Sequence, residues 1–396
     1  MRTIFLSGAP CKVKSLKSWI IDIRRDLHKT PELGLEEFLT KEKIIKYLEE
    51  IGIDYTTYPN HTGVMAYINK NAKTTVAIRA DIDALPIIET NNKNYKSIHN
   101  GKMHACGHDA HTAILIGSCK VLYDMRDELD VNVKFLFQPA EETVGGAKLL
   151  IKDCCMENPK VDYTIGLHVM PHINTGMVEL QYDSMSASTD TVNITIEGKQ
   201  CHGAYPHQGI DSIVVAGHVI CALQSIVSRN IDPTDSVVLS LGLINGGIKE
   251  NVICPKVTIS GTLRALNSDT RKYAKERIKE IVDFTCKGLG ALGSVDIEEG
   301  YAPLVNDSFV VDIIKENAIN LLGKDNVVFR KNPSLGAEDF SFFLEHSKGA
   351  FYNLGCRNED KNILSPLHTA DFDIDEDCLE IGVMLHVLNT LSFAKL

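Results

Sequence analysis

The order of predicted strands and helices between residues 191 and 299 limits the fold of this chain more than any other feature of its sequence. Four segments have the composition and length of strands, at residues 191–197, 236–243, 257–266 and 294–299. Two segments have helical periodicity, at residues 210–228 and 270–287. The resulting order is strand, helix, strand, strand, helix, strand, which is the signature of a compact ferredoxin-like unit.

The sequence on both sides of this unit has a different pattern. Short apolar runs at residues 64–68, 75–79, 131–137 and 163–169 alternate with helical stretches, and a helix near 306–322, a strand at 350–354 and a final helix from Asp375 follow the insert. Such alternation favours an α/β layered domain. Because 396 residues exceed the roughly 250 to 300 that one core accommodates, two domains are expected.

We therefore predict a discontinuous α/β/α catalytic domain and an inserted βαββαβ domain. The first comprises residues 1–186 and 302–396, and the insert comprises residues 187–301, with hinges near 184–188 and 301–305.

Charge and cysteine content exclude several classes of function. The net charge is −11, from 41 Lys and Arg against 52 Asp and Glu, and no basic run occurs, so we expect no nucleic-acid partner. Near the N-terminus the apolar run Ile4 to Leu6 is too short for a signal peptide or for the ~20 residues that span a bilayer. We expect a cytoplasmic protein with no membrane partner. The eleven scattered cysteines, such as Cys119, Cys221 and Cys286 in helical contexts, should mostly be buried free thiols.

Residues 103–111, with the sequence MHACGHDAH, place three histidines, a cysteine and an aspartate in nine positions. Cys106 and His108 are two residues apart, and Gly107 between them lets the turn tighten, so both can bind one transition metal such as Zn²⁺ or Mn²⁺. A helix N-terminus at this point would favour the thiolate form of Cys106. A single histidine here could equally cap a helix or pack in the core, but the density of the cluster favours metal binding.

Three further segments carry candidate ligands at the ends of predicted strands or before the last helix. Glu141 and Glu142 follow the strand at 131–137, His168 lies at the end of the strand at 163–169, and His368 precedes the final helix. One glutamate can bind metal while the other acts as general base, as metal-assisted hydrolysis requires. Each residue alone could be structural. Together with Cys106 and His108, Glu142 and the two histidines give five ligands, enough for two ions.

Asp81 and Asp83 follow another apolar strand and alternate, so both should face the same side. We expect one of them to orient an active-site histidine or ligand.

Seven motifs occur in an order that resembles a known family across nearly the whole chain. They are RRDLHKTPELGLEE, RADIDALP, MHACGHDAH, PAEETVGGA, GLHV, GAEDF and LHTADF. This pattern is similar to the amidohydrolase branch of the metallopeptidase family that also contains aminoacylase and carboxypeptidase G. Hippurate hydrolases, N-acyl-diaminopimelate deacetylases and auxin-conjugate amidohydrolases belong to that branch.

The resemblance implies a role for each site residue. Asp83 corresponds to the carboxylate that supports the ligands and Glu141 to the general base. Relatives outside the branch often have a histidine ligand where this chain has Asp81, and His108 is expected to compensate. The metal ligands correspond to Cys106, His108, Glu142, His168 and His368.

For the inserted domain, the resemblance implies a lid that also forms a homodimer. His202 corresponds to a histidine that reaches the active site of the partner subunit and stabilises the oxyanion. Asn251 and Arg264 match residues expected to hold the substrate carboxylate. The chain departs from the branch at Cys201, where glycine is usual, and at Cys254, where the pair Cys-Pro replaces Pro-Asp. Neither departure touches a predicted ligand, though the substrate pocket near the lid could differ.

The sequence therefore predicts a dinuclear amidohydrolase that releases a carboxylic acid and a free amino acid from N-acyl amino acids, such as N-acetyl or N-benzoyl derivatives. Two divalent ions per subunit are expected, with Zn or Mn favoured and Co or Ni also suited to these ligands. Two other functions stay open at this point: a dipeptidase or carboxypeptidase, and a non-catalytic relative that binds a small ligand.

Overall fold

The structure is a computed structural model that describes residues 8–394. The expectation drawn from the apolar run Ile4 to Leu6 lies outside these residues. The chain forms two compact units. The first consists of Met1–Asp183, Val305–Lys331 and Asp339–Leu396, and the second consists of Ser184–Leu304 and Asn332–Glu338.

The first unit is built on an eight-stranded mixed sheet with the order β1-β2-β4-β3-β5-β14-β6-β13. The strands are β1 (Asp54–Thr57), β2 (Val64–Ile68), β3 (Thr75–Asp81), β4 (Asn132–Gln138), β5 (Tyr163–Asn174), β6 (Val178–Leu180), β13 (Val327–Phe329) and β14 (Lys348–Arg357). The four central strands β4, β3, β5 and β14 are parallel. Every residue of β3 and β4 is buried, as expected of central strands in a sheet that is covered on both faces.

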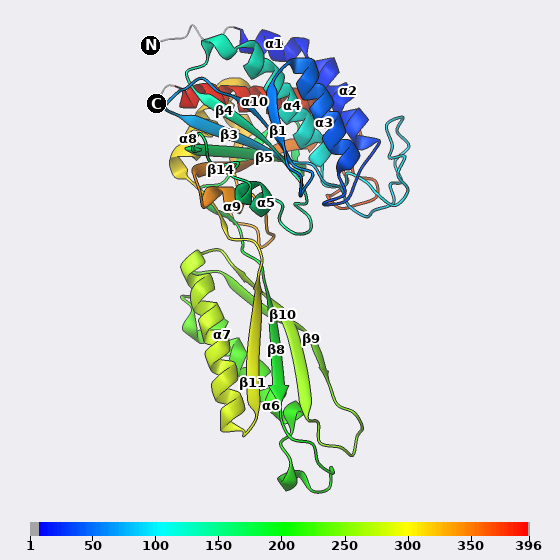
Figure 1. Ribbon diagram of the computed structural model, residues 1–396, viewed down its shortest axis with the longest axis vertical. Coiled ribbons are helices and arrows are strands. Elements are labelled where there is room, and N and C mark those ends of the chain that lie inside the picture. Colours follow the sequence, from blue (N-terminus) through cyan, green and yellow to red (C-terminus); the bar gives the residue numbers. More distant parts are fainter. Residues whose placement is uncertain (1–7, 395–396) are drawn as a thin grey trace. The chain divides into compact units, whose positions relative to one another are not determined.

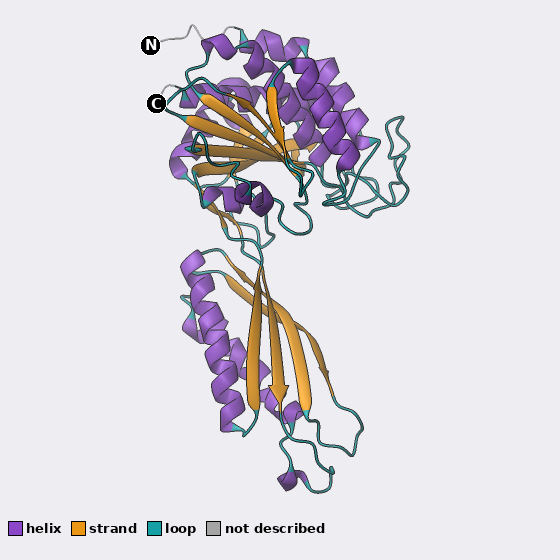
Figure 2. Cartoon of the chain, in the orientation of Figure 1, coloured by secondary structure: helices purple, strands orange, loops and turns teal. Residues whose placement is uncertain are grey.

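Helices lie on both faces of this sheet, with α4 and α10 on one face and α5 and α9 on the other (Figures 1 and 2). The helices of the first unit are α1 (Ala9–Ser15), α2 (Lys17–His28), α3 (Phe38–Ile51), α4 (His108–Asp124), α5 (Ala147–Lys152), α8 (Ser308–Leu322), α9 (Ser341–Leu344) and α10 (Asp377–Phe393). Helix α4 packs between the sheet and the outer helices, and nearly all of its residues are buried. Because β3, β4 and β5 are parallel, their carboxyl ends lie at the same edge of the sheet, where open α/β sheets bind ligands.

The second unit is a four-stranded antiparallel sheet with the order β11-β8-β10-β9 and two helices. Its elements are β8 (Asp190–Glu197), α6 (Ser212–Ser225), β9 (Val237–Gly246), β10 (Lys256–Ala265), α7 (Ser268–Gly288) and β11 (Leu292–Glu299). Helix α7 begins where the Asn267 side chain accepts hydrogen bonds from the N–H groups of Asp269 and Thr270. The predicted α/β fold with a βαββαβ insert is confirmed.

The prediction that most cysteines are buried free thiols is confirmed: all eleven are free and seven of them are buried. Of the three named from helical contexts, Cys119 and Cys286 are buried, but Cys221 is exposed on α6. This helix is apolar around its whole circumference, so the sequence does not reveal which side faces the core. Helix α6 and the π-helical turn Ile226–Asn230 together form the one helical stretch, within residues 8–394, that is long and apolar enough to cross a membrane. Only 33% of its most apolar window is buried inside the protein.

Candidate metal centre

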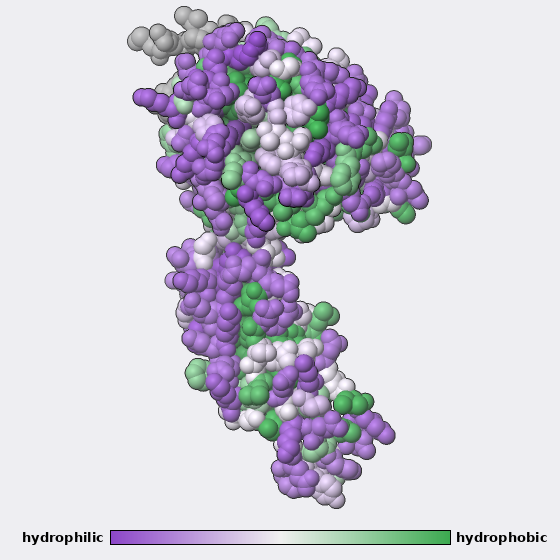
Figure 3. Space-filling view, in the orientation of Figure 1, coloured by the Kyte–Doolittle hydropathy of each residue, from purple (hydrophilic) through white to green (hydrophobic). Residues whose placement is uncertain are grey.

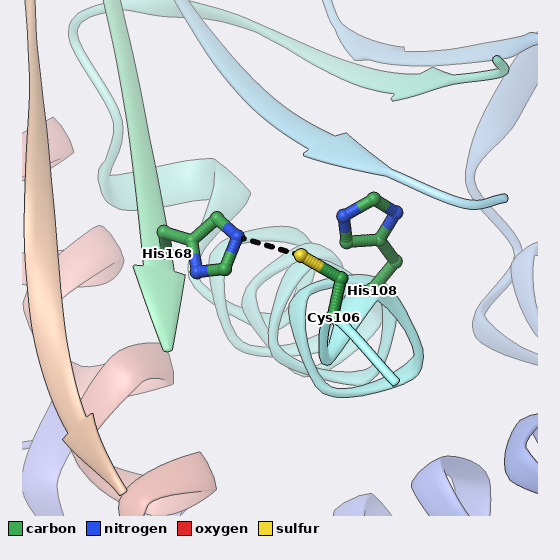
Figure 4. Close-up of side chains that lie close together, drawn as sticks. All are labelled: Cys106, His108 and His168. Atoms are coloured by element: carbon green, nitrogen blue, oxygen red, sulfur yellow. Dashed lines mark hydrogen bonds between the residues drawn. The ribbon is translucent and has the colours of Figure 1, made fainter. Parts of the chain in front are cut away.

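The five predicted ligands come from four separate segments of the first unit. Two groups consist of these ligands alone and share one atom, and His108 and Glu142 also form a group with Glu141. Cys106, His108 and His168 form one group, and Cys106, Glu142 and His368 form the other. Within each group the ligand atoms all lie within 4.8 Å of one another. Figure 4 shows the Cys106 side chain between His168, on β5, and His108, at the start of α4. The Cys106 sulfur is thus the only atom common to both groups.

The imidazole of His168 turns an unprotonated ring nitrogen toward the Cys106 side chain. Its Nδ1 donates a hydrogen bond to the backbone oxygen of Val169 at 2.7 Å, which leaves Nε2 unprotonated. Nε2 lies 3.3 Å from the Cys106 sulfur. Burial lowers the pKa of His168 to about 3, so the ring is neutral at physiological pH. A neutral imidazole whose second nitrogen is fixed by a carbonyl is the usual form of a metal-bound histidine.

His368 also lies next to the Cys106 sulfur. Its Nε2 lies 3.3 Å from Cys106 Sγ and 3.1 Å from Glu142 Oε1. The residue has a φ of 62°, a left-handed conformation that costs roughly 1 to 3 kcal/mol for a non-glycine residue and that typically occurs at functional sites. Its N–H donates to Ala105 O at 2.8 Å, which ties the loop before α10 to the segment that carries Cys106.

His108 supplies direct evidence that the site fits a metal ion. Its Nε2 is buried and makes no hydrogen bond with any residue in the described range. The nearest carboxylate oxygens to Nε2 are those of Asp81 at 3.7 Å and Glu142 at 4.0 Å. Its Nδ1 lies 3.2 Å from Asp83 Oδ1, and the other Asp83 oxygen accepts the N–H of Glu142 at 3.1 Å. Asp83 thus contacts two candidate ligands, His108 and Glu142. The buried Nε2 of His108 has no hydrogen-bond partner within residues 8–394, which costs free energy unless an ion binds it.

The expected helix N-terminus follows Cys106 directly, but burial has the larger effect on its thiol. Helix α4 begins only at His108, with Gly107 preceding it in a left-handed conformation, so Cys106 lies outside the helix. Burial raises the pKa of the Cys106 thiol well above its usual value. A cation bound at Cys106 would replace the thiol proton, as metal binding to cysteine generally does.

Glu141 and Glu142 lie in the turn that follows β4, and both are near His108. Burial opposes ionisation of Glu142, but the hydrogen bond to His368 and the charge of His108 lower the pKa of Glu142 to about 2. Glu141 is also largely buried, at 8% exposed. One ionised carboxylate therefore joins the second ligand group, and the carboxyl group of Glu141 lies near it.

A buried polar network behind the centre was only partly expected from the sequence. Asp81 accepts a hydrogen bond from Nδ1 of His111 at 2.6 Å, and Nε2 of His111 accepts the N–H of Val169, next to the ligand His168, at 2.9 Å. Arg79 pairs with Asp81 and with Asp339, each at 2.8 Å. The sequence offered Asp81 and the motif containing Asp339 as signals, but the role of His111 could not be separated from that of the neighbouring histidines.

The three predicted substrate-contacting residues lie in the second unit, whereas the five ligands lie in the first. His202 is exposed, and it lies beside Asn251, since the N–H of Gly203 donates to Asn251 O at 2.8 Å and His202 bridges to the next residue, Val252. Arg264, on β10, donates from Nη1 to Leu335 O at 3.1 Å. The structure therefore brings His202 and Asn251 together and engages Arg264 with a different loop of the same unit.

Comparisons with known proteins agree with this geometry. The model of the peptidase family M20/M25/M40 matches residues 77–389. The chain is similar to N-acetyl-L-cysteine deacetylase of Bacillus subtilis (39% identical over 93% of this chain and 87% of that protein). It is also similar to hippurate hydrolase of Campylobacter jejuni (38%, covering 94% and 96%) and to thermostable carboxypeptidase 2 of Saccharolobus solfataricus (37%, covering 97% of each).

Among solved structures, a dinuclear metal-binding peptidase of the M20 family from Bacillus subtilis superimposes on the chain with a TM-score of 0.83. The two are 31% identical, over 96% of this chain and 99% of that one. The likeness thus covers both units and not only the residues around the metal centre.

Proposed function

Because the chain belongs to the peptidase M20/M25/M40 family, we propose that it hydrolyses the amide bond of N-acyl amino acids and releases a carboxylic acid and a free amino acid. It is a metal-dependent hydrolase. The observation that carries the proposal is the pair of ligand groups sharing the Cys106 sulfur, with the second carboxylate Glu141 beside them. Two relatives named for N-acyl amino acid hydrolysis support the substrate class.

The two ligand groups would hold two divalent ions, and bound ions would polarise the substrate carbonyl and lower the pKa of a bound water. Glu141 then accepts a proton from the attacking water while the water oxygen forms a bond to the carbonyl carbon. As the C–N bond breaks, Glu141 donates that proton to the leaving nitrogen. Asp83 keeps His108 and the backbone of Glu142 in place throughout, because its two oxygens contact both.

We infer that the first unit is the catalytic domain and that the second unit acts as a lid and dimerisation domain. In this proposal His202 donates a hydrogen bond to the developing oxyanion in the active site of the partner subunit, an interaction of a type worth ~2.7 to 4 kcal/mol. Asn251 and Arg264 hold the substrate carboxylate, a task that suits a guanidinium group.

The surface of the second unit supports the homodimer. Strand β9 is an edge strand, and it exposes Leu243 and Ile244, while the neighbouring helix α6 exposes Ile213 and Val214. Apolar surface is visible near β9 in Figure 3. An unpaired edge beside an apolar helix face is suited to pairing with a second copy.

Charged substitutions test this dimer. Leu243→Asp should give monomers in analytical ultracentrifugation, whereas Phe284→Asp, at an equally exposed position on α7, should not. A dimer that persists in Leu243→Asp would contradict this interface.

For the cofactors we propose Zn or Mn, with Co and Ni as further candidates, because a thiolate, three imidazoles and a carboxylate suit all four. We also propose a cytoplasmic location, with no membrane or nucleic-acid partner, which is consistent with eleven free cysteines and a net charge of −11.

A carboxypeptidase or dipeptidase is the second candidate, since one relative is named a carboxypeptidase. Reconstituted enzyme should be assayed with N-acetyl, N-succinyl, N-benzoyl and N-indoleacetyl amino acids and with free dipeptides, and the released amine measured. Higher kcat/KM on acylated amino acids supports our proposal. Faster cleavage of dipeptides favours the peptidase, and no release from either class would leave only a ligand-binding relative.

A further inference from the structure

A buried carboxylate outside the metal centre contacts the turn that carries Glu141. Glu37, at the residue before α3, is 0% exposed. Its Oε1 accepts the N–H of Ala140 at 2.9 Å, and its Oε2 accepts the hydroxyl of Thr62 at 2.5 Å. Within residues 8–394, no hydrogen bond joins the Glu37 side chain to any of the five predicted ligands. Its hydrogen bond reaches the residue immediately before the general base.

Ala140 has a backbone conformation that needs such support. Its φ is 52°, in the left-handed region that alanine rarely adopts. The Ala140 carbonyl accepts the N–H groups of Gly145 and Gly146, each at 3.2 Å, so the turn closes on itself from Ala140 onward. The direction in which Glu141 leaves β4 is thus set at Ala140, and Glu37 is the side chain that satisfies the buried N–H there.

The segment that contains Glu37 also packs closely against the same turn. A methyl group added at Gly34 would lie 2.5 Å from the Thr143 hydroxyl and 3.1 Å from Ala140 Cα. A larger residue at position 34 would therefore press on the Thr143 side chain and on Ala140. The turn from Ala140 to Gly146 therefore packs against residues 34–37. It is also fixed by Asp83, which accepts a hydrogen bond from the N–H of Glu142.

We propose that Glu37 is a positioning residue for catalysis: through Ala140 it fixes where the Glu141 carboxylate lies. The inference rests on the proposed function, because it presupposes that Glu141 is the general base. Without Glu37, the N–H of Ala140 and the hydroxyl of Thr62 lose their buried acceptor, so the turn should relax toward an ordinary backbone conformation. A displacement of about 1 Å in a catalytic group can reduce the rate about 100-fold.

The test measures kcat, KM and bound metal for Glu37→Ala and Glu37→Gln. We expect kcat of Glu37→Ala to fall about 10- to 100-fold with KM changed less than about threefold and metal content retained. Glu37→Gln keeps an oxygen acceptor for Ala140 and should stay within about threefold of wild type. Burial raises the pKa of Glu37 to about 7, so a neutral side chain is already tolerated there.

Two other variants keep the test decisive. Thr62→Val removes one anchor of Glu37 at nearly constant volume and should lower kcat several-fold even if Glu37→Ala does not fold. Glu36→Ala, at the exposed neighbour that pairs with Lys102, is the matched control and should leave kcat unchanged.

Wild-type kcat in both Glu37→Ala and Thr62→Val would overturn the inference, as would a fall in kcat matched by an equal loss of metal. Glu141→Gln, assayed in parallel, separates this failure from that of the proposed function. If Glu141→Gln is inactive and Glu37→Ala is fully active, only the positioning role is wrong. If Glu141→Gln retains activity, the proposed function itself fails.

Discussion

Replacing Cys106 with alanine should remove both metal ions, whereas replacing one histidine ligand should remove one. The reason is geometric: the Cys106 sulfur belongs to both ligand groups, while His168 and His368 each belong to a single group. An ion that binds only the folded state stabilises it by about 2.7 kcal/mol when its free concentration is 100 times Kd. At that concentration Cys106→Ala should lose about 5 kcal/mol of metal-dependent stabilisation, and each histidine variant about half as much.

The assay is elemental analysis of protein dialysed against buffered metal, together with urea unfolding in the presence and absence of that metal. Cys11→Ser, at an exposed thiol on α1, is the control and should bind as much metal as wild type. Retention of one ion per subunit by Cys106→Ala would show that the sulfur is not shared. Loss of both ions from His168→Ala would show that the two groups do not bind independently.

Three further predictions concern stability, the lid and the support of the ligands. Burial lowers the pKa of His386 from 6.5 to about 3, so the folded state resists protonation and the free energy of unfolding should fall as the pH drops from 6.5 to 3, by as much as roughly 5 kcal/mol. His386→Leu should reduce the change in unfolding free energy with pH, measured by urea titrations between pH 6.5 and 3. An unchanged pH dependence would show that His386 is not its source. Mixing inactive Glu141→Gln with inactive His202→Ala subunits should restore activity in mixed dimers, and no recovery would mean that His202 does not act across the interface. Asp83→Ala should weaken metal affinity about 10- to 100-fold by freeing His108, and unaltered affinity in competition with a chelator would contradict that role.

The fold was largely predictable because its elements have strong and distinct patterns. Strands β3 and β4 are rich in apolar residues over five to seven positions, and the insert alternates apolar and polar residues along β8. Short strands such as β6 and β13, at three residues each, were not predicted, because a segment of that length shows no periodicity. The exposed side of α6 was mispredicted at Cys221 for a related reason, since its apolar residues surround the helix.

The site was predictable as a set of segments but not in all its contacts. The parallel strands bring their carboxyl ends to one edge, so Glu142 and His168 could be expected near Cys106. The separate roles of the clustered histidines could not be expected. Since α4 starts at His108, His111 lies on the next turn and bonds Asp81, whereas His104 precedes the helix and is buried with no hydrogen-bond partner in residues 8–394. Such differences depend on where the helix begins, and that boundary is among the least certain features of a sequence.

The contribution of Glu37 was also hidden, because a glutamate in a polar segment usually lies in solvent. The structure shows that Glu37 is buried although its neighbours Leu35 and Glu36 are exposed, and that Gly34 packs on the turn after β4.

The most direct test of the central claim is the rate of amino acid release from an N-acyl amino acid by metal-loaded Glu141→Gln, compared with wild type at equal metal content. Gln has almost the same shape as Glu but cannot accept the proton from water, so the account predicts full metal occupancy with turnover abolished. Retained turnover at full occupancy would contradict it, because the proton would then be moved by another group.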